Sequence, residues 1–115
     1  MKSRILAKTI AAAALEKKAE DVVVLDLHKL QAFTDYFVIA TGTSDRQVQA
    51  IARAIEETLH LKKEKPIGIE GLQAGRWVLI DYGDVVAHVF YTEDREYYQL
   101  ERLWADAPRL KLAGC

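Results

Sequence analysis

The sequence predicts an α/β domain in which helices flank a mixed β-sheet. Helical and strand-like hydrophobic patterns alternate along the chain in the order α-β-β-α-β-β-β-α. A tight turn joins the last two strand-like runs, which requires those two strands to be antiparallel. A long amphipathic helix after the second strand allows a parallel crossover. At 115 residues the chain fits one domain, which we place at residues 1–108, followed by a loosely held tail at 109–115.

Three elements are predicted within the first 40 residues. Residues 3–19 predict a helix, because apolar side chains recur every three or four positions and alanine is frequent. The β-branched run at 22–27 predicts a short strand. The continuous apolar run at 36–40 predicts a strand buried on both faces, in the middle of a sheet that helices cover.

A capped helix is predicted next. Residues 41–44, Thr-Gly-Thr-Ser, end the second strand, and Ser44 is expected to cap the helix that follows. Gln47 stands three positions later and is expected to complete a capping box. Pro66 ends this region, and residues 67–70 predict a short strand. The helix is expected to bury one apolar stripe, formed by Val48, Ile51, Ala52, Ile55 and Leu59.

The C-terminal part of the chain predicts a hairpin and a last helix. Residues 71–75 form a glycine-containing loop, and strands are predicted at 77–82 and 85–91 around a Gly-Asp turn. Thr92 is expected to cap a helix that ends before Pro108. We expect the apolar side of this helix to consist of Tyr97, Leu100, Leu103 and Trp104.

Composition narrows the class of partner and the location. Sixteen basic and seventeen acidic residues leave a net charge of −1. Direct nucleic-acid binding depends on phosphate neutralisation, so we expect little direct contact with nucleic acid. Lys8 interrupts the apolar N-terminal run, and no run approaches the roughly 20 residues that span a bilayer, which predicts no membrane insertion and a cytoplasmic location. The one cysteine, Cys115, cannot form an internal disulfide.

The sequence offers weak candidates for catalysis or for a metal or cofactor. Residues 41–44 could hold an anion at a helix N-terminus, but the lysine of a phosphate-binding loop is missing. Gly42, Ser44 and Asp81 could form a nucleotidyltransferase-like arrangement. Such enzymes need two or three clustered carboxylates, and Asp81 and Asp84 lack a third. We therefore predict no enzyme, no cofactor and no metal site. The histidines are too scattered for a metal motif: His28, His60 and His88.

The hairpin has features of a protein-binding surface. Trp77 begins a strand beside the glycine-containing loop, where full burial is hard to achieve, and aromatic residues are enriched at interface cores. Trp77 and Tyr82 differ in strand parity, so they should lie on opposite faces of the sheet. Asp81 and Asp84 would add an acidic rim for a basic partner; stabilisation of the turn is the alternative role.

The predicted strand and helix also place His88 and Trp104. His88 shares a strand face with Phe90 by its period of two, and either a half-buried or a partner-contacting role fits it. Trp104 lies on the apolar side of the last predicted helix, and we expect it to pack in the core.

Two long runs are specific in residue type and spacing. They are GRWVLIDYGDVVAHVFYTEDREYYQLERLW at residues 75–104 and DYFVIATGTSDRQVQAIARAIEE at residues 35–57. Together they resemble the ribosomal silencing factor family (RsfS, also called Iojap-like), over roughly residues 4–107. Ala87 departs mildly, because the family commonly has a larger apolar residue there.

The resemblance implies a non-catalytic translation factor. Its fold would be nucleotidyltransferase-like without the catalytic carboxylates. The factor would bind the large ribosomal subunit through the fourteenth protein of that subunit. It would thereby block association with the small subunit sterically and repress translation. When free, it would be a homodimer. Trp77 and Tyr82 would be aromatic anchors, Asp81 and Asp84 would face basic side chains, and His88 would supply hydrogen bonding. Carried over by position, the partner-binding residues are Trp77, Asp81, Tyr82, Asp84, His88, Phe90 and Tyr98.

Two alternatives belong to different functional classes. The first is a nucleotidyltransferase-like enzyme, which metal-dependent nucleotide binding in calorimetry would support. The second is a protein-interaction module with a non-ribosomal client. Sedimentation with purified large subunits separates that module from a ribosome-binding factor, because only the latter migrates stoichiometrically with the subunit.

Overall fold

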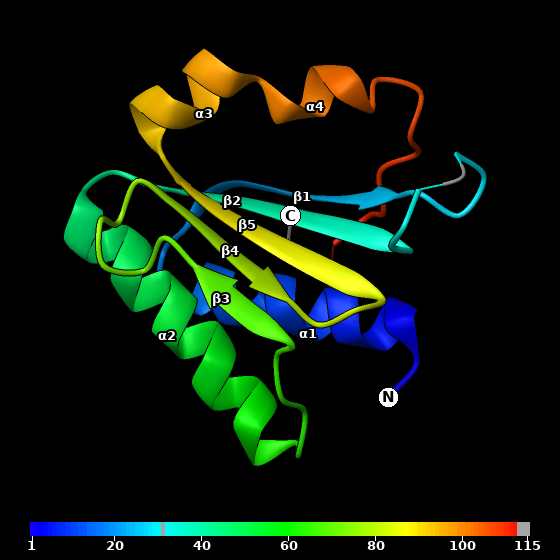
Figure 1. The fold of residues 1–115 in the computed structure, drawn as a ribbon, viewed down its shortest axis with the longest axis horizontal. Helices are drawn as coiled ribbons and strands as arrows, with labels where there is room; N and C mark the ends of the chain where they lie inside the picture. The colour runs from blue at the N-terminus through cyan, green and yellow to red at the C-terminus, as the bar shows by residue number, and fades with distance from the viewer. Residues whose placement is uncertain (31, 113–115) are drawn as a thin grey trace.

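The structure is a computed structural model that describes residues 1–30 and 32–112, so Cys115 lies outside the described residues. One sheet carries helices on both faces, as the sequence predicted (Figure 1). In chain order the elements are α1 (Ser3–Glu16), β1 (Glu20–Asp26), β2 (Tyr36–Gly42), α2 (Asp45–Leu61), β3 (Gly68–Glu70), β4 (Trp77–Asp81), β5 (Val85–Tyr91), α3 (Thr92–Tyr98) and α4 (Leu100–Leu103).

The sheet is mixed, which confirms the predicted fold class. Its five strands lie in the order β1-β2-β5-β4-β3. The β2–β5 pair is parallel, because the chain leaves β2 through α2 and returns along the same direction, whereas the other pairs are antiparallel. Every residue of β2 is buried, as expected for an inner strand covered on both faces.

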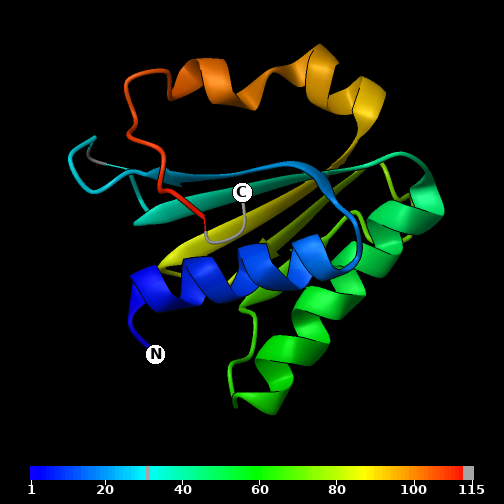
Figure 2. The ribbon, with the colours of Figure 1, turned by 180° about the vertical axis from the view of Figure 1, so that it is seen from behind.

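One face of the sheet is covered by α1 and α2, which we call the helical face (Figure 2). The predicted stripe of α2 is buried in full against it. Aliphatic side chains dominate the contact, and alanines on α1 let the two helices lie close to the strands. Its largest fully buried members are Ile10, Ile51, Ile55, Leu59 and Ile80.

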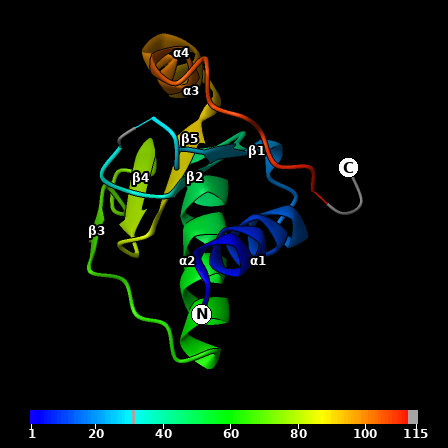
Figure 3. The ribbon, with the colours of Figure 1, turned by 90° about the vertical axis from the view of Figure 1, so that its right-hand side faces the viewer.

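The opposite face, which we call the aromatic face, has a thinner cover. It buries Phe37, Ile39 and Phe90 beneath α3, α4 and the segment that follows them. Neither α3 nor α4 has a buried residue of its own. Figure 3 shows these two helices above β1, β2 and β5, whereas β4 and β3 extend beyond them. The part of this face at β4 and β3 is therefore less covered, and only Tyr98 of α3 reaches Trp77 on β4.

The start of α2 is capped as predicted, but the capping box differs. Ser44 Oγ accepts a hydrogen bond from the Gln47 backbone N–H at 3.0 Å. The Gln47 side-chain oxygen accepts from the N–H of Thr43 at 2.6 Å, one residue earlier than the expected partner. The Gln47 amide nitrogen also donates to the carbonyl oxygens of Lys17 and Lys18, so this side chain joins the two helices. The α1 helix ends at Glu16, before those two lysines.

The prediction of one continuous C-terminal helix is wrong. Gln99 adopts a left-handed conformation, with φ 46°, and divides the segment into α3 and α4. Thr92 is the first residue of α3 and not its cap; its hydroxyl donates to the carbonyl of Gly42 at 3.2 Å. Two residues expected on the apolar side, Tyr97 and Leu103, are instead exposed, and in α3 it is Tyr98 that contacts Trp77 on the sheet.

The C-terminal segment runs along the free edge of β1. The N–H of Asp26 donates to the carbonyl of Pro108 at 2.8 Å, and the N–H of Leu110 donates to the carbonyl of Val24 at 2.9 Å. These bonds occupy an edge that would otherwise expose backbone groups. Of the tail expected at 109–115, residues 109–112 are thus held by β1 and by packing of Leu110, while 113–115 lie outside the described residues.

Candidate partner-binding surface

Four of the sequence-predicted residues form one cluster on the aromatic face. Trp77 on β4 pairs with Phe90 on β5, and Leu79 pairs with His88 one step along the strands. The Trp77 ring lies 4.8 Å from that of Phe90 and 4.9 Å from that of Tyr98, measured between centroids. Trp77, His88, Phe90 and Tyr98 are therefore brought together by two strands and α3.

Trp77 is half-buried and its indole nitrogen is already used. The Nε1–H donates to Nδ1 of His88 at 3.1 Å. Because Phe90 lies on one side of the indole and Tyr98 approaches it from α3, the ring is held in place while part of it stays open to solvent. Such a rigid, partly exposed aromatic has the properties of an interface anchor.

His88 and Phe90 lie beneath the surface. His88 is 4% exposed and Phe90 is 0% exposed. Burial lowers the pKa of His88 to about 4, so its imidazole is neutral at physiological pH. The two side chains thus support the cluster from within, and its exposed part comes from Trp77 and Tyr98.

Other apolar side chains of α3 and α4 are exposed besides Tyr98. Tyr98 is 51% exposed, and its neighbour Tyr97, which meets it edge-to-face at 5.0 Å, is 79% exposed. Leu103 is exposed on α4, and Trp104 is half-buried with its ring edge-to-face on Phe37 at 5.8 Å. Trp104 was expected to pack in the core, and its half-buried position confirms that prediction only in part.

Tyr82, at the hairpin turn, lies on the other face of the sheet from Trp77. As predicted, Tyr82 and Trp77 are on opposite faces: Tyr82 packs against the helical-face core, and Trp77 packs on the aromatic face. Burial, helped by the nearby carboxylates of Glu56 and Glu64, raises the pKa of Tyr82 to about 12. The Tyr82 hydroxyl is buried and has no hydrogen-bond partner among the described residues.

The two acidic residues at the hairpin, Asp81 and Asp84, have different surroundings. Asp81 accepts a hydrogen bond from the N–H of Gly83 at 2.7 Å, so it stabilises the turn. Gly83 has a φ of 87°, a conformation that favours glycine. Asp84 is exposed, and its backbone carbonyl accepts from the N–H groups of Asp35 and Tyr36. By strand parity Asp81 lies on the same face as Trp77, at the opposite end of β4.

Sequence reasoning missed a hollow on the open half of the aromatic face. It measures about 290 Å³ and is lined by Trp77, Leu79, Glu70 and Gly71. A side chain at Gly71 would meet the carbonyl oxygen of Trp77 at 2.0 Å, so only glycine allows this close approach. The strand parity that Leu79 shares with Trp77 was a usable signal for Leu79, whereas nothing in the sequence pointed to Glu70.

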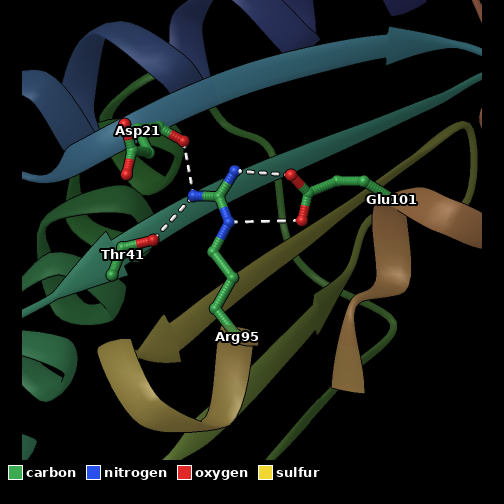
Figure 4. A network of polar contacts seen from close by, with 4 residues as sticks. All are labelled: Asp21, Thr41, Arg95 and Glu101. Carbon is green, nitrogen blue, oxygen red and sulfur yellow. Dashed lines mark hydrogen bonds and ion pairs between the residues drawn. The ribbon is translucent and has the colours of Figure 1, made fainter. Parts of the chain in front are cut away.

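Arg95 holds the cover of the aromatic face in place (Figure 4). Its guanidinium forms two parallel bonds to the Glu101 carboxylate, at 3.3 and 3.0 Å, across the break between α3 and α4. It also donates to Thr41 Oγ1 at 2.6 Å and to the backbone carbonyl of Asp21. Asp21 lies in an irregularity of β1. One side chain therefore ties both short helices to the first two strands.

Arg76 makes a second connection between the loop and α3. Its guanidinium lies 2.6 Å from the Asp94 carboxylate and 4.8 Å from the centroid of the Tyr91 ring. The hydrogen bond to Asp94 raises the pKa of Arg76 above its ordinary value. Since Trp77 follows directly in the chain, this pair fixes the start of β4 against α3.

The geometry at the start of α2 does not favour an anion-binding site. The N–H groups of Thr43, Arg46 and Gln47 are each bonded to a side-chain oxygen of the chain itself. Across residues 1–30 and 32–112, no three His, Cys, Asp or Glu side chains are grouped so that they could hold a metal ion. Within that same part of the chain, no helix is both long enough and apolar enough to cross a bilayer.

Comparison with known proteins decides the family. The family model described as "Ribosomal silencing factor during starvation" (RsfS) matches residues 1–114. The chain belongs to the RsfS family. Similar proteins of Bacillus subtilis and Halalkalibacterium halodurans are named ribosomal silencing factors, a name that describes no enzymatic activity.

Two curated relatives show how far the similarity extends. Ribosomal silencing factor RsfS of Bacillus subtilis is 46% identical over 108 residues, which span 94% of this chain and 92% of that protein. The mouse protein named "Mitochondrial assembly of ribosomal large subunit protein 1" is 37% identical over 92 residues, 77% of this chain and 40% of its own length. The RsfS similarity thus extends to a longer organellar protein.

A solved structure supports the fold directly. A crystal structure of a protein from Chromobacterium violaceum matches with a TM-score of 0.89 and 35% sequence identity, covering 100% of this chain and 95% of that one. The mixed sheet with helices on both faces is therefore an arrangement that an experimentally determined protein shares.

Proposed function

We propose that this RsfS-family protein binds the large ribosomal subunit through the fourteenth protein of that subunit and blocks association with the small subunit. Family membership supports a ribosomal partner, and the name of the mouse relative refers to the large subunit. On this proposal the protein acts in the cytoplasm, as a homodimer when free, and represses translation.

The observation that carries the proposal is the half-open aromatic cluster. Trp77 is held rigidly yet is partly exposed, and Tyr98 and the hollow at Leu79 lie beside it. Rigid aromatic side chains in partly formed pockets supply most of the affinity of typical protein interfaces. Docking would cover the part of the aromatic face that α3 and α4 leave open.

Acidic groups at the hollow and at the hairpin turn suit a basic protein partner. Glu70 lines the hollow, Asp81 lies on the same sheet face, and Asp84 is exposed at the turn. Complementary charge raises the association rate and selects among partners more than it adds affinity. Repression would then follow from occupancy alone: a bound domain with extents of 34 × 33 × 29 Å excludes another large body from the same surface. The dissociation rate would decide how long the block lasts.

A subunit-association assay tests the function. Purified large subunits are incubated with excess protein, small subunits are added, and joining is followed by light scattering. Joining should slow in proportion to occupancy, measured in parallel by sedimentation. Joining at the normal rate despite stoichiometric co-sedimentation would refute the blocking step. Failure to co-sediment would refute ribosome binding and leave the interaction module with another client.

Trp77→Ala tests the surface. We expect it to weaken binding to large subunits by about 2 kcal/mol or more, while circular dichroism still shows a folded protein, because the helical face is untouched. Leu61→Ala is a matched control, since Leu61 is an exposed apolar residue at the far end of α2. Equal affinities for the two variants would remove Trp77 from the interface.

A further inference from the structure

The hydrogen bond between Trp77 and His88 joins a partly exposed anchor to a buried support. Trp77 directly opposes Phe90, so His88 is its diagonal neighbour on β5. The indole Nε1–H donates to His88 Nδ1 at 3.1 Å, and the two ring centroids are 6.1 Å apart. The bond therefore points from the surface into the sheet.

The protonation of His88 follows from that bond. Nδ1 accepts, so the neutral ring carries its proton on Nε2. The Nε2 atom is buried and has no hydrogen-bond partner among the described residues. A buried donor without a partner costs free energy, which an apolar side chain of similar size would avoid. Packing alone therefore does not explain a histidine at this position.

A histidine at this position is explained by the hydrogen bond that it accepts from the indole N–H of Trp77. Burial keeps the pKa of His88 near 4, so the Nδ1 lone pair is available throughout the physiological pH range. The imidazole is itself held by neighbouring rings, edge-to-face on Phe37 at 4.6 Å and stacked on Phe90 at 6.3 Å. A fixed acceptor can hold a second group at a fixed angle.

We propose that His88 is a positioning residue for the Trp77 anchor and does not itself touch the partner. The inference rests on the proposed function and assigns His88 a role within the same surface. The bond already restricts the rotation of the indole in the free protein. Binding therefore does not have to remove that rotational freedom. It also turns the indole N–H inward, so the partner meets the carbon surface of Trp77 beside Leu79 and gains no hydrogen bond from it.

Two substitutions of His88 separate positioning from packing. His88→Leu keeps an apolar side chain and removes the acceptor. His88→Asn is smaller, but its Oδ1 takes the place of Nδ1 in the side chain and restores the acceptor. Affinity for purified large subunits should fall by about five- to tenfold in His88→Leu, the loss expected when one side chain must be ordered on binding. His88→Asn should bind within about twofold of wild type, although it packs less well.

The indole N–H resonance of Trp77 gives a readout that does not depend on the ribosome. It is identified by its loss in Trp77→Phe. Exchange of this proton with solvent should be slow in the wild type and in His88→Asn, and fast in His88→Leu. Fast exchange in the wild type, or unchanged exchange in a folded His88→Leu, would overturn the positioning role. Equal loss of affinity in the Leu and Asn variants would also overturn it, because packing alone would then matter.

The outcome also distinguishes this inference from the proposed function. If the wild-type protein does not co-sediment with large subunits, the proposed function fails, and the exchange rates alone decide whether His88 holds Trp77. If it co-sediments and His88→Leu binds as tightly as wild type, the function stands and the inference fails.

Discussion

The helical face of the sheet is packed with aliphatic side chains under two long helices, whereas the aromatic face holds rings and a histidine under two short ones. The helical face is closed along α1 and α2, which contribute six and five buried residues. The aromatic face is held by α3 and α4, which contribute none, and it is partly open over β4 and β3, where only Tyr98 reaches Trp77. Burial on the helical face is complete before any partner arrives, and burial on the aromatic face is not.

That difference suggests a division of labour between the two faces. Aliphatic packing over a whole face stabilises the fold and offers little for recognition. The aromatic face combines rigid rings with polar side chains such as His88 and Arg95, which cost free energy to bury and need specific partners. We expect substitutions on the helical face to change stability, and substitutions at the open edge of the aromatic face to change binding.

The largest effect is expected from Ile51→Ala on α2. Ile51 is fully buried on the helical face, and removing a buried isoleucine side chain costs about 3 to 4 kcal/mol through lost transfer free energy and the cavity left behind. Urea unfolding measures this loss. The remaining folded protein should bind large subunits with wild-type affinity, and weaker binding by the folded fraction would show that the two faces are coupled.

The pH dependence of stability should report His88 on the aromatic face. Its folded pKa of about 4 lies below the ordinary 6.5, so the unfolded chain binds the proton more tightly between these values. Stability should therefore fall as pH decreases from 6.5 to 4, by about 3 kcal/mol in total, and this decrease should be absent in His88→Leu.

The shifted pKa values of Asp26 and His28 change stability outside that window. Asp26 has a lowered pKa, because the hydrogen bonds from His28 outweigh its desolvation, so its contribution is lost only as pH falls below 3.8. The hydrogen bond to Asp26 raises the pKa of His28, so that contribution is present below pH 6.5 and is lost as pH rises through the folded value. An identical pH slope in wild type and His88→Leu would contradict the assignment.

The two faces were also predictable from the sequence to different degrees. The stripe of α2 and the Ser44 cap follow from periodicity and local hydrogen bonding, so they were correct. The break at Gln99 was not predictable, because no glycine or proline marks it. It coincides with the ion pair between Arg95 and Glu101, a tertiary contact that a residue pattern does not reveal.

The candidate site shows the same limit. Strand parity correctly separated Trp77 from Tyr82, because a period of two is a local property. Whether His88 and Phe90 would be exposed depended on how Phe37, Trp77 and the cover of the sheet pack around them, and the sequence did not show this. Their predicted partner-binding roles, like those of the other five residues, stay predictions until binding is measured.

Arg95→Ala tests how firmly the thin cover is held. The substitution removes bonds to Glu101, Thr41 and the carbonyl of Asp21, and it leaves a partly buried carboxylate unpaired. We expect a loss of about 2 kcal/mol in stability. Hydrogen exchange should rise in α3 and α4 and stay unchanged in α1 and α2. A uniform rise across all helices would mean that both faces unfold as one unit, against the division proposed above.

The smallest effect is expected from Asp84→Asn at the open edge. Asp84 is exposed at the turn, so loss of its charge should leave stability unchanged and weaken binding to large subunits by about twofold at low salt. The dependence of affinity on salt should also decrease, because screening acts mainly on exposed charges. Asp106→Asn is the matched control, since Asp106 is an exposed carboxylate beyond α4. Equal salt dependence in both variants would place the basic partner surface elsewhere, and the acidic side chains of the hairpin would then serve the turn alone.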